Sequence, residues 1–218
     1  MGKENKLAMI KICGIKDMNT AHIAIDAGVN ALGFVFAESS RRILPEDAKK
    51  IIQSLPKNIL RVGVFVNAPV SLVKEIAEYC NLTALQFHGI ESVDYCRQYK
   101  RKVIKAIKVS KGGQSFPDPA IYRGIVKYFL TDTYQPGADG GTGKVFPWKN
   151  IETIKKYGLV ILAGGLKPNN IFQALSVTNP WGVDVSSGVE TRGCKDEKKI
   201  KKYIEEIQRW KNGQNITG

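Results

Sequence analysis

The chain has 218 residues, of which 43% are hydrophobic and 24% charged, and no apolar run is long enough to cross a bilayer. The polar start of the sequence lacks the pattern of a secretory signal, so we expect a cytoplasmic protein that does not contact a membrane. The formal net charge of +13 is spread over predicted helix faces, without a basic block flanked by aromatics, which favours a solvated surface over a nucleic-acid partner.

Short runs rich in β-branched residues alternate with amphipathic stretches along the whole chain. Strands are predicted over 9–13, 31–36, 60–66, 84–88, 102–109, 127–132, 158–165 and 181–187. Between them apolar residues recur every three or four positions, which predicts helices on the outside of a sheet. The connection over 111–126 is rich in Gly and Pro, so we expect it to be mostly loop.

Helix boundaries carry suitable residues. Asp17 precedes the first predicted helix, Pro45 and Pro168 begin two others, and Gly28 suits a helix end. The last helix should pack one apolar face on the sheet: Ile200, Tyr203, Ile204, Ile207 and Trp210. Eight strand–helix units predict an α/β protein with one (β/α)8 barrel domain over 1–218, because a six-stranded open sheet would leave two strands unexplained.

A barrel of this kind places its active site where the strands end. The predicted strand ends and the loops after them carry Cys13, Arg41, Arg42, His88, Asp132, Gly164, Gly165, Asp184, Ser186 and Ser187. The sequence therefore predicts a polar site at one end of the barrel.

Cys13 is the first of these residues, and a buried cysteine is more often inert packing than a catalyst. Lys11 lies two positions earlier on the same face of the strand, where an ammonium group would lower the cysteine pKa and favour a thiolate. Lys11 could instead form a structural ion pair with an inward carboxylate. Gly14 lets the chain turn at once and leaves room for a substrate against the backbone.

Asp132 ends an otherwise apolar strand. It could be a turn residue before the glycine-rich loop, since Asp is common at such exits. A carboxyl group walled by apolar side chains would instead have a raised pKa and could act as a general acid. Cys13 and Asp132 would then form a base and an acid on the first and sixth strands.

Two glycine- and serine-containing loops follow the seventh and eighth strands. Such loops in barrels often bind phosphate through backbone N–H groups. The candidates are Gly164, Gly165, Ser186, Ser187 and Gly188.

The "GGTG" segment over 140–143 lacks the Walker spacing, and we interpret it as a lid. Arg41 or Arg42 could bind a carboxylate, or both could be solvated.

The four cysteines, Cys13, Cys80, Cys96 and Cys194, form no CxxC pair, and the chain has only two histidines. We therefore expect free thiols, no disulfide and no metal. Cys80 and Cys96 fall on apolar helix faces and are predicted to be core residues.

Taken together, the motifs resemble those of the phosphoribosylanthranilate isomerase family. The segments "KICGI", "GFVF", "SSRRI", "VGVFVN", "LQFHG", "LTD" before "GGTGK", "LAGGLKPNN" and "VDVSSGVE" occur in the family's order at similar spacings. The match runs nearly end to end. One departure is "GKVFPW", which stands where the family usually has a segment like GKTFDW.

The resemblance implies an isomerase of tryptophan biosynthesis that performs an Amadori rearrangement of N-(5-phosphoribosyl)anthranilate without a cofactor. It implies Cys13 as general base, Asp132 as general acid and Arg41 on the anthranilate carboxylate, although Arg42 offers a second guanidinium. Asp184, His88 and Lys11 are expected as further substrate contacts, and the two glycine loops would hold the phosphate. The partner is thus a phosphosugar, and the chain is a monomer or a homodimer.

Three other readings remain open from the sequence. ProFAR isomerase performs the same rearrangement in histidine synthesis but looks like a two-aspartate enzyme, and Cys13 argues against it. Indole-glycerol-phosphate synthase resembles the chain in its barrel but requires a lysine acid and a glutamate in other places. A basic nucleic-acid-binding barrel without catalysis would show a salt-dependent gel shift instead of turnover.

Overall fold

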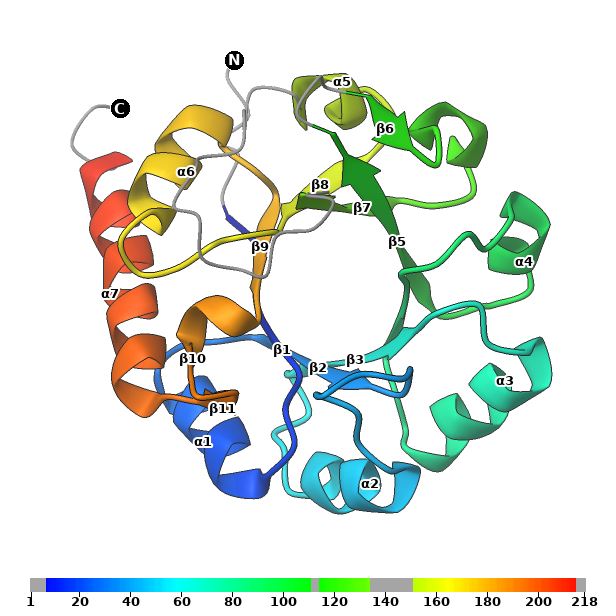
Figure 1. Cartoon of the computed structure of the whole chain (residues 1–218), viewed down its shortest axis with the longest axis horizontal. Coiled ribbons are helices and arrows are strands. Elements are labelled where there is room, and N and C mark those ends of the chain that lie inside the picture. Colours follow the sequence, from blue (N-terminus) through cyan, green and yellow to red (C-terminus); the bar gives the residue numbers. More distant parts are fainter. Residues whose placement is uncertain (1–6, 111–113, 134–150, 215–218) are drawn as a thin grey trace.

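The computed structural model describes residues 7–110, 114–133 and 151–214, and its centre is a closed ring of parallel strands (Figure 1). The ring consists of β1 (Met9–Cys13), β2 (Ala31–Val35), β3 (Leu60–Phe65), β4 (Ala84–Phe87), β5 (Lys102–Val109), β7 (Tyr128–Thr133), β8 (Leu159–Leu162) and β9 (Gly182–Val185). Each strand pairs with its neighbours in chain order, β9 pairs with β1, and β4 with β5, so the sheet has no open end. The predicted (β/α)8 barrel is confirmed.

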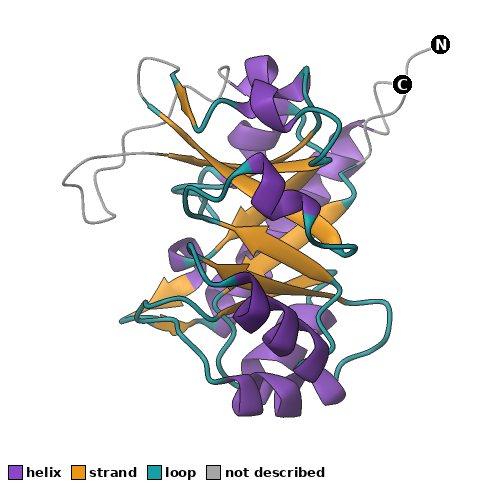
Figure 2. Cartoon of the chain, turned by 90° about the vertical axis from the view of Figure 1, so that its right-hand side faces the viewer, coloured by secondary structure: helices purple, strands orange, loops and turns teal. Residues whose placement is uncertain are grey.

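Helices surround this ring, as Figures 1 and 2 show. They are α1 (Met18–Asp26), α2 (Pro45–Gln53), α3 (Val70–Tyr79), α4 (Val93–Arg97), α5 (Ile151–Lys155), α6 (Ile171–Thr178) and α7 (Glu197–Gln214). The Asp17 side chain caps α1 by accepting a hydrogen bond from the Thr20 N–H, as the sequence indicated. The α6 helix begins at Ile171, so Pro168 lies in the preceding turn instead of at the helix start.

The fifth connection differs from the others. The short strand β6 (Ser115–Phe116) returns antiparallel to β5, and a 3₁₀ helix (Pro119–Tyr122) leads into β7. This agrees with the expectation of a mostly irregular segment. The glycine loop over 140–143 lies outside the described residues. None of the described helices has the length and apolar character needed to span a membrane.

Alternation along the strands sorts side chains into two compartments. On β1, Ile10 and Ile12 pack outward against the helices, whereas Met9 faces the barrel interior with other apolar side chains. Lys11 and Cys13 share the inward face with Met9. The register pairs Lys11 with Asp184 on β9, so two charged side chains meet inside the barrel. The main apolar core thus lies between the strands and the helices, and the barrel interior is polar near the carboxyl ends of β1 and β9.

The final helix and the cysteines follow the predicted pattern. The five apolar residues predicted for one face of α7 are all buried. The helix packs against α1 and α6 and so covers the β1–β9 side of the barrel. Burying each such side chain contributes about 1.5–3 kcal/mol. Cys80 and Cys96 are buried among apolar residues, and all four cysteines are free.

Candidate active site

A cavity of about 390 Å³ opens at the carboxyl ends of the barrel strands. Ten of the predicted site residues line it: Cys13, Arg41, His88, Asp132, Gly164, Gly165, Asp184, Ser186, Ser187 and Gly188. They come from six different strand ends and the loops that follow. Lys11 is not among the lining residues, because it lies one layer deeper, and neither is the exposed Arg42. The structure therefore brings nearly the whole predicted set to one chamber.

Lys11 forms a buried ion pair with Asp184, a residue that lines the cavity. Its Nζ lies 3.0 Å from each carboxylate oxygen of Asp184, and the lysine is fully buried. Burial alone would lower the pKa of Lys11, but Asp184 and Cys13 raise it, and the net direction is upward. The lysine is therefore held charged, in the structural ion pair that the sequence left open as one alternative.

Cys13 is 8% exposed and lines the cavity, as Asp184 does, next to the buried Lys11. Burial raises the pKa of the Cys13 thiol; Lys11 lowers it, but the neighbouring Asp184 carboxyl raises it again. The net shift is upward, opposite to the thiolate that Lys11 alone predicted. The expected charge effect is present, but Asp184 neutralises much of it and desolvation outweighs the rest.

This environment predicts slow alkylation of Cys13 at neutral pH. Because only the thiolate reacts, the iodoacetamide rate should keep rising about tenfold per pH unit through pH 9, the usual thiol pKa. Peptide mass spectrometry would follow Cys13, with the exposed Cys194 as the internal reference. An alkylation rate of Cys13 that has already levelled off at pH 7 would contradict the raised pKa of this thiol.

Gly33 makes room for this arrangement on the neighbouring strand. It pairs in register with Cys13, and a Cβ added there would lie 2.9 Å from the Cys13 Sγ and 2.8 Å from the Lys11 Nζ. Any side chain at this position would displace both groups. The sequence offered no reason to single out Gly33, because its role depends on two side chains of another strand.

Asp132 lies at the end of β7 and contacts His88. The distance from His88 Nε2 to Asp132 Oδ2 is 3.2 Å, and His88 Nδ1 lies 3.1 Å from the Nε2 of Gln86. The Asp132 side chain is 36% exposed and faces the cavity. The apolar wall expected around this carboxyl group is therefore replaced by a polar row of three side chains.

Arg41 occupies the cavity rim, where it pairs with Glu190. Its Nε and Nη2 donate to the two carboxylate oxygens at 2.7 Å each, a bidentate contact. Lys195 reaches the same carboxylate at 2.6 Å. Burial would raise the pKa of Glu190, but these two cations lower it to about 2. One carboxylate thus shares two cations, which leaves a net positive charge at the rim.

The two glycine loops, which follow β8 and β9, contact each other at the cavity wall. Gly164 and Gly165 adopt positive φ angles of 80° and 67°, which favour glycine. Gly188 packs so closely on the Leu166 backbone that a side chain would overlap the Leu166 carbonyl. The loops after β8 and β9 therefore form one continuous backbone surface beside the cavity.

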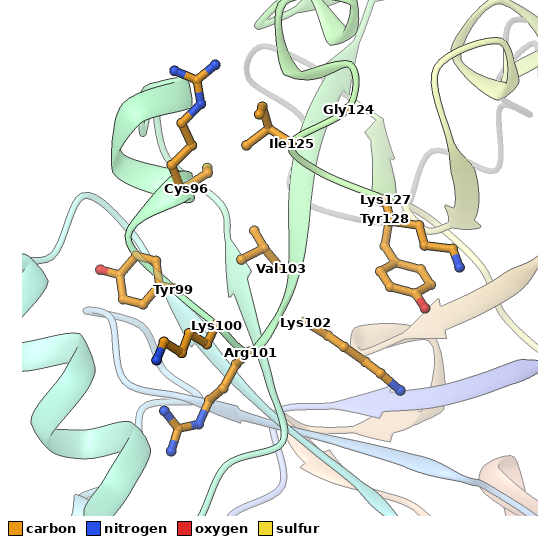
Figure 3. Close-up of a pocket in the computed structure, with 11 residues that line it drawn as sticks. Cys96, Tyr99, Lys100, Arg101, Lys102, Val103, Gly124, Ile125, Lys127 and Tyr128 are labelled. Carbon is orange, nitrogen blue, oxygen red and sulfur yellow. The ribbon is translucent and has the colours of Figure 1, made fainter.

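A second cavity of about 540 Å³ lies at the opposite end of the barrel, near the starts of β5 and β7 (Figure 3). Its cations are Arg97, Lys100, Arg101, Lys102 and Lys127. In Figure 3 Lys100 and Arg101 extend to one side and Lys102 to the other, so the charges do not converge on one point. Arg97 and Arg101 are already paired with Asp94 and Glu78. The first cavity is therefore the candidate active site.

Three further residues of the site were given no role from the sequence: Gln86, Glu190 and Lys195. Gln86 was recognisable in principle, because it is a polar residue on the inward face of an apolar strand, two positions before His88. Glu190 matched a family position, but its pairing with Arg41 spans 149 residues. Lys195 looked like one more member of a charged surface run.

The closed barrel and the polar chamber at its strand ends define the class: this is a (β/α)8-barrel enzyme. A model of the family described as N-(5'-phosphoribosyl)anthranilate (PRA) isomerase matches residues 10–206. The isomerase of Desulforudis audaxviator is 48% identical over 205 residues, which cover 91% of this chain and 97% of the relative. The isomerase of Moorella thermoacetica is 44% identical, with 93% and 91% covered. The chain belongs to the phosphoribosylanthranilate isomerase family, as its motifs indicated.

Solved structures agree with this assignment. The phosphoribosylanthranilate isomerase of Thermotoga maritima superposes with a TM-score of 0.82 at 38% identity, covering 93% of this chain and 99% of that one. A structure of the isomerase in complex with reduced 1-(o-carboxyphenylamino)-1-deoxyribulose 5-phosphate gives a TM-score of 0.78 at 35% identity, with the same coverage of both chains.

Proposed function

We propose that this chain converts N-(5-phosphoribosyl)anthranilate into 1-(2-carboxyphenylamino)-1-deoxyribulose 5-phosphate, with Cys13 as general base and Asp132 as general acid. The observation that carries the proposal is that a thiol on β1 and a carboxyl group on β7 line one cavity, bordered by the two glycine loops. The strands β8 and β9 separate them in the ring, so they face a substrate from different walls.

The reaction needs only proton transfers. Asp132 donates a proton to the furanose ring oxygen, the C1–O bond breaks, and the nitrogen lone pair forms a C1=N iminium. Cys13 reacts from the small thiolate fraction that its raised pKa leaves at neutral pH: this thiolate removes the proton from C2, and the electrons move to C1=C2 and nitrogen to give an enolamine. Loss of the C2 hydroxyl proton to Asp132 and return of a proton from Cys13 to C1 yield the ketone. Atoms and charge balance, and neither an oxidant nor a reductant is required.

The ends of the substrate would be held at opposite sides of the cavity. The phosphate would lie on the backbone of Gly164, Gly165 and Ser186–Gly188, where glycine permits close approach. The anthranilate carboxylate would bind Arg41, whose Nη1 makes no hydrogen bond to any residue in the described part of the chain. His88 and Asp184 would contact the sugar. We assign Lys11 to holding Asp184 in place beside Cys13.

Replacing Arg41 by alanine should mainly weaken substrate binding. A hydrogen bond between charged groups contributes about 1.5–3 kcal/mol, so we expect KM to rise about tenfold to a hundredfold with a smaller change in kcat. The matched control is Arg42→Ala, which removes an exposed guanidinium outside the cavity and should leave KM unchanged. If Arg42→Ala gave the KM effect instead, the carboxylate site would move to Arg42.

The activity itself can be tested by generating phosphoribosylanthranilate in the cuvette and following the loss of its fluorescence after the protein is added. The histidine-pathway substrate ProFAR serves as the comparison. If the protein converted ProFAR and not phosphoribosylanthranilate, its activity would be that of the histidine pathway. Absence of both activities together with a salt-dependent gel shift would favour the nucleic-acid-binding alternative.

We propose further that the functional unit is one barrel domain spanning 1–218, that it works in the cytoplasm, and that it is a monomer or a homodimer. A dimeric form is named for the Thermotoga maritima isomerase. Light scattering at assay concentration would distinguish the two states.

A further inference from the structure

Gln86 is a buried polar side chain that the reaction above does not use. It is 1% exposed and lies on the inward face of β4, two residues before His88. Its amide nitrogen contacts His88 Nδ1, but its Oε1 has no hydrogen-bond partner in the described part of the chain. Leaving a buried acceptor without a partner is unfavourable. Internal hydrogen bonding therefore does not explain why an amide occupies this place.

The contact with His88 favours one tautomer of the ring, given the side on which the structure places the Gln86 amide nitrogen. An amide N–H₂ group can only donate, so Nδ1 must accept and be unprotonated. The proton of the neutral ring then lies on Nε2, which is the nitrogen 3.2 Å from Asp132 Oδ2. In this tautomer His88 donates to Oδ2. The Asp184 carboxyl group also interacts electrostatically with His88, from β9.

This tautomer directs the proton of the general acid. When Oδ2 of Asp132 accepts from His88, a protonated Asp132 must carry its hydrogen on Oδ1. In the opposite tautomer, Nε2 would accept, and the acidic proton would lie between Oδ2 and the imidazole, away from the substrate. Only the first arrangement leaves Oδ1–H free to reach a ring oxygen in the cavity.

We propose that Gln86 is a positioning residue that fixes the Nε2–H tautomer of His88 and thereby orients the acidic proton of Asp132 towards the substrate. The inference rests on the proposed function for its catalytic part. Its structural part, the tautomer, exists in the free protein and can be measured without substrate.

The test combines histidine NMR with kinetics. The chain has only two histidines, His22 and His88, so a long-range ¹H–¹⁵N spectrum of ¹⁵N-histidine-labelled protein is assigned with one His22→Asn variant. At alkaline pH, above the ordinary histidine pKa of about 6.5, we expect Nδ1 of His88 to be unprotonated and Nε2 protonated. Gln86→Glu replaces the donor by an acceptor and should move the proton to Nδ1.

The same variant should lower kcat about tenfold to a hundredfold, a part of what a general acid contributes. Gln86→Leu is the matched control for added negative charge: it keeps the volume, removes the donor and should also reduce kcat while KM stays near the wild-type value. It also replaces Gln86→Glu if that variant does not fold.

The outcomes separate this inference from the function. A wild-type His88 protonated on Nδ1, or Gln86 variants with wild-type kcat, would overturn the role of Gln86. Failure of the wild-type protein to turn over phosphoribosylanthranilate would instead overturn the proposed function, because the NMR result does not depend on activity.

Discussion

The Cys13→Ser variant is expected to lose nearly all turnover while remaining folded. A serine hydroxyl has almost the volume of the thiol but a far higher pKa, so it cannot supply a base at neutral pH. Removing a general base typically costs about 10² to 10⁴ in rate. The Lys11–Asp184 pair does not depend on the sulfur for its 3.0 Å contacts. The fluorescence assay measures the loss, and circular dichroism with thermal unfolding verifies the fold.

Two control variants isolate the effect of Cys13. Cys194→Ser removes an exposed thiol and should retain wild-type kcat. Cys80→Ala removes a thiol that is fully buried between helices, so it should lower the free energy of unfolding but leave kcat unchanged. Full activity of a folded Cys13→Ser variant would exclude the thiol as the base, and another group on the cavity wall would have to be found.

The sequence was sufficient to predict which residues meet at the barrel mouth. In a closed parallel barrel, all strands end at the same side, so Cys13, His88 and Asp132 had to gather once their strands were recognised. No distance information is needed for this step. The same logic found the two glycine loops, because each follows a strand end. The fold and most of the candidate site thus follow from periodicity and topology.

What the sequence could not provide is the pairing of side chains across the cavity. Arg41 contacts Glu190 through rotamers that only the packed structure determines, and Lys195 adds a second cation from a short strand pair, β10 (Glu190–Thr191) and β11 (Cys194–Lys195). Electrostatics is even less predictable, since it depends on every neighbour. Lys11 alone suggested a thiolate at Cys13, but Asp184 and burial reverse the direction of the pKa shift. The spacing in the sequence relates Lys11 to Cys13 but does not show that Asp184 lies beside both.

Asp132→Asn should be the second severe variant, because it leaves the size of the side chain unchanged and removes the transferable proton. An amide cannot protonate the furanose oxygen, so ring opening becomes limiting and kcat should fall about 10²- to 10⁴-fold. Binding should change little, since Arg41 and the glycine loops are untouched. Titration with reduced 1-(o-carboxyphenylamino)-1-deoxyribulose 5-phosphate, the ligand of a related structure, would measure the binding affinity of the variant.

The matched control is Asp118→Asn, which alters the N-cap of the 3₁₀ helix outside the cavity and should keep wild-type kcat. A large loss of ligand affinity with unchanged kcat would make Asp132 a binding group, and the acid would then have to be His88.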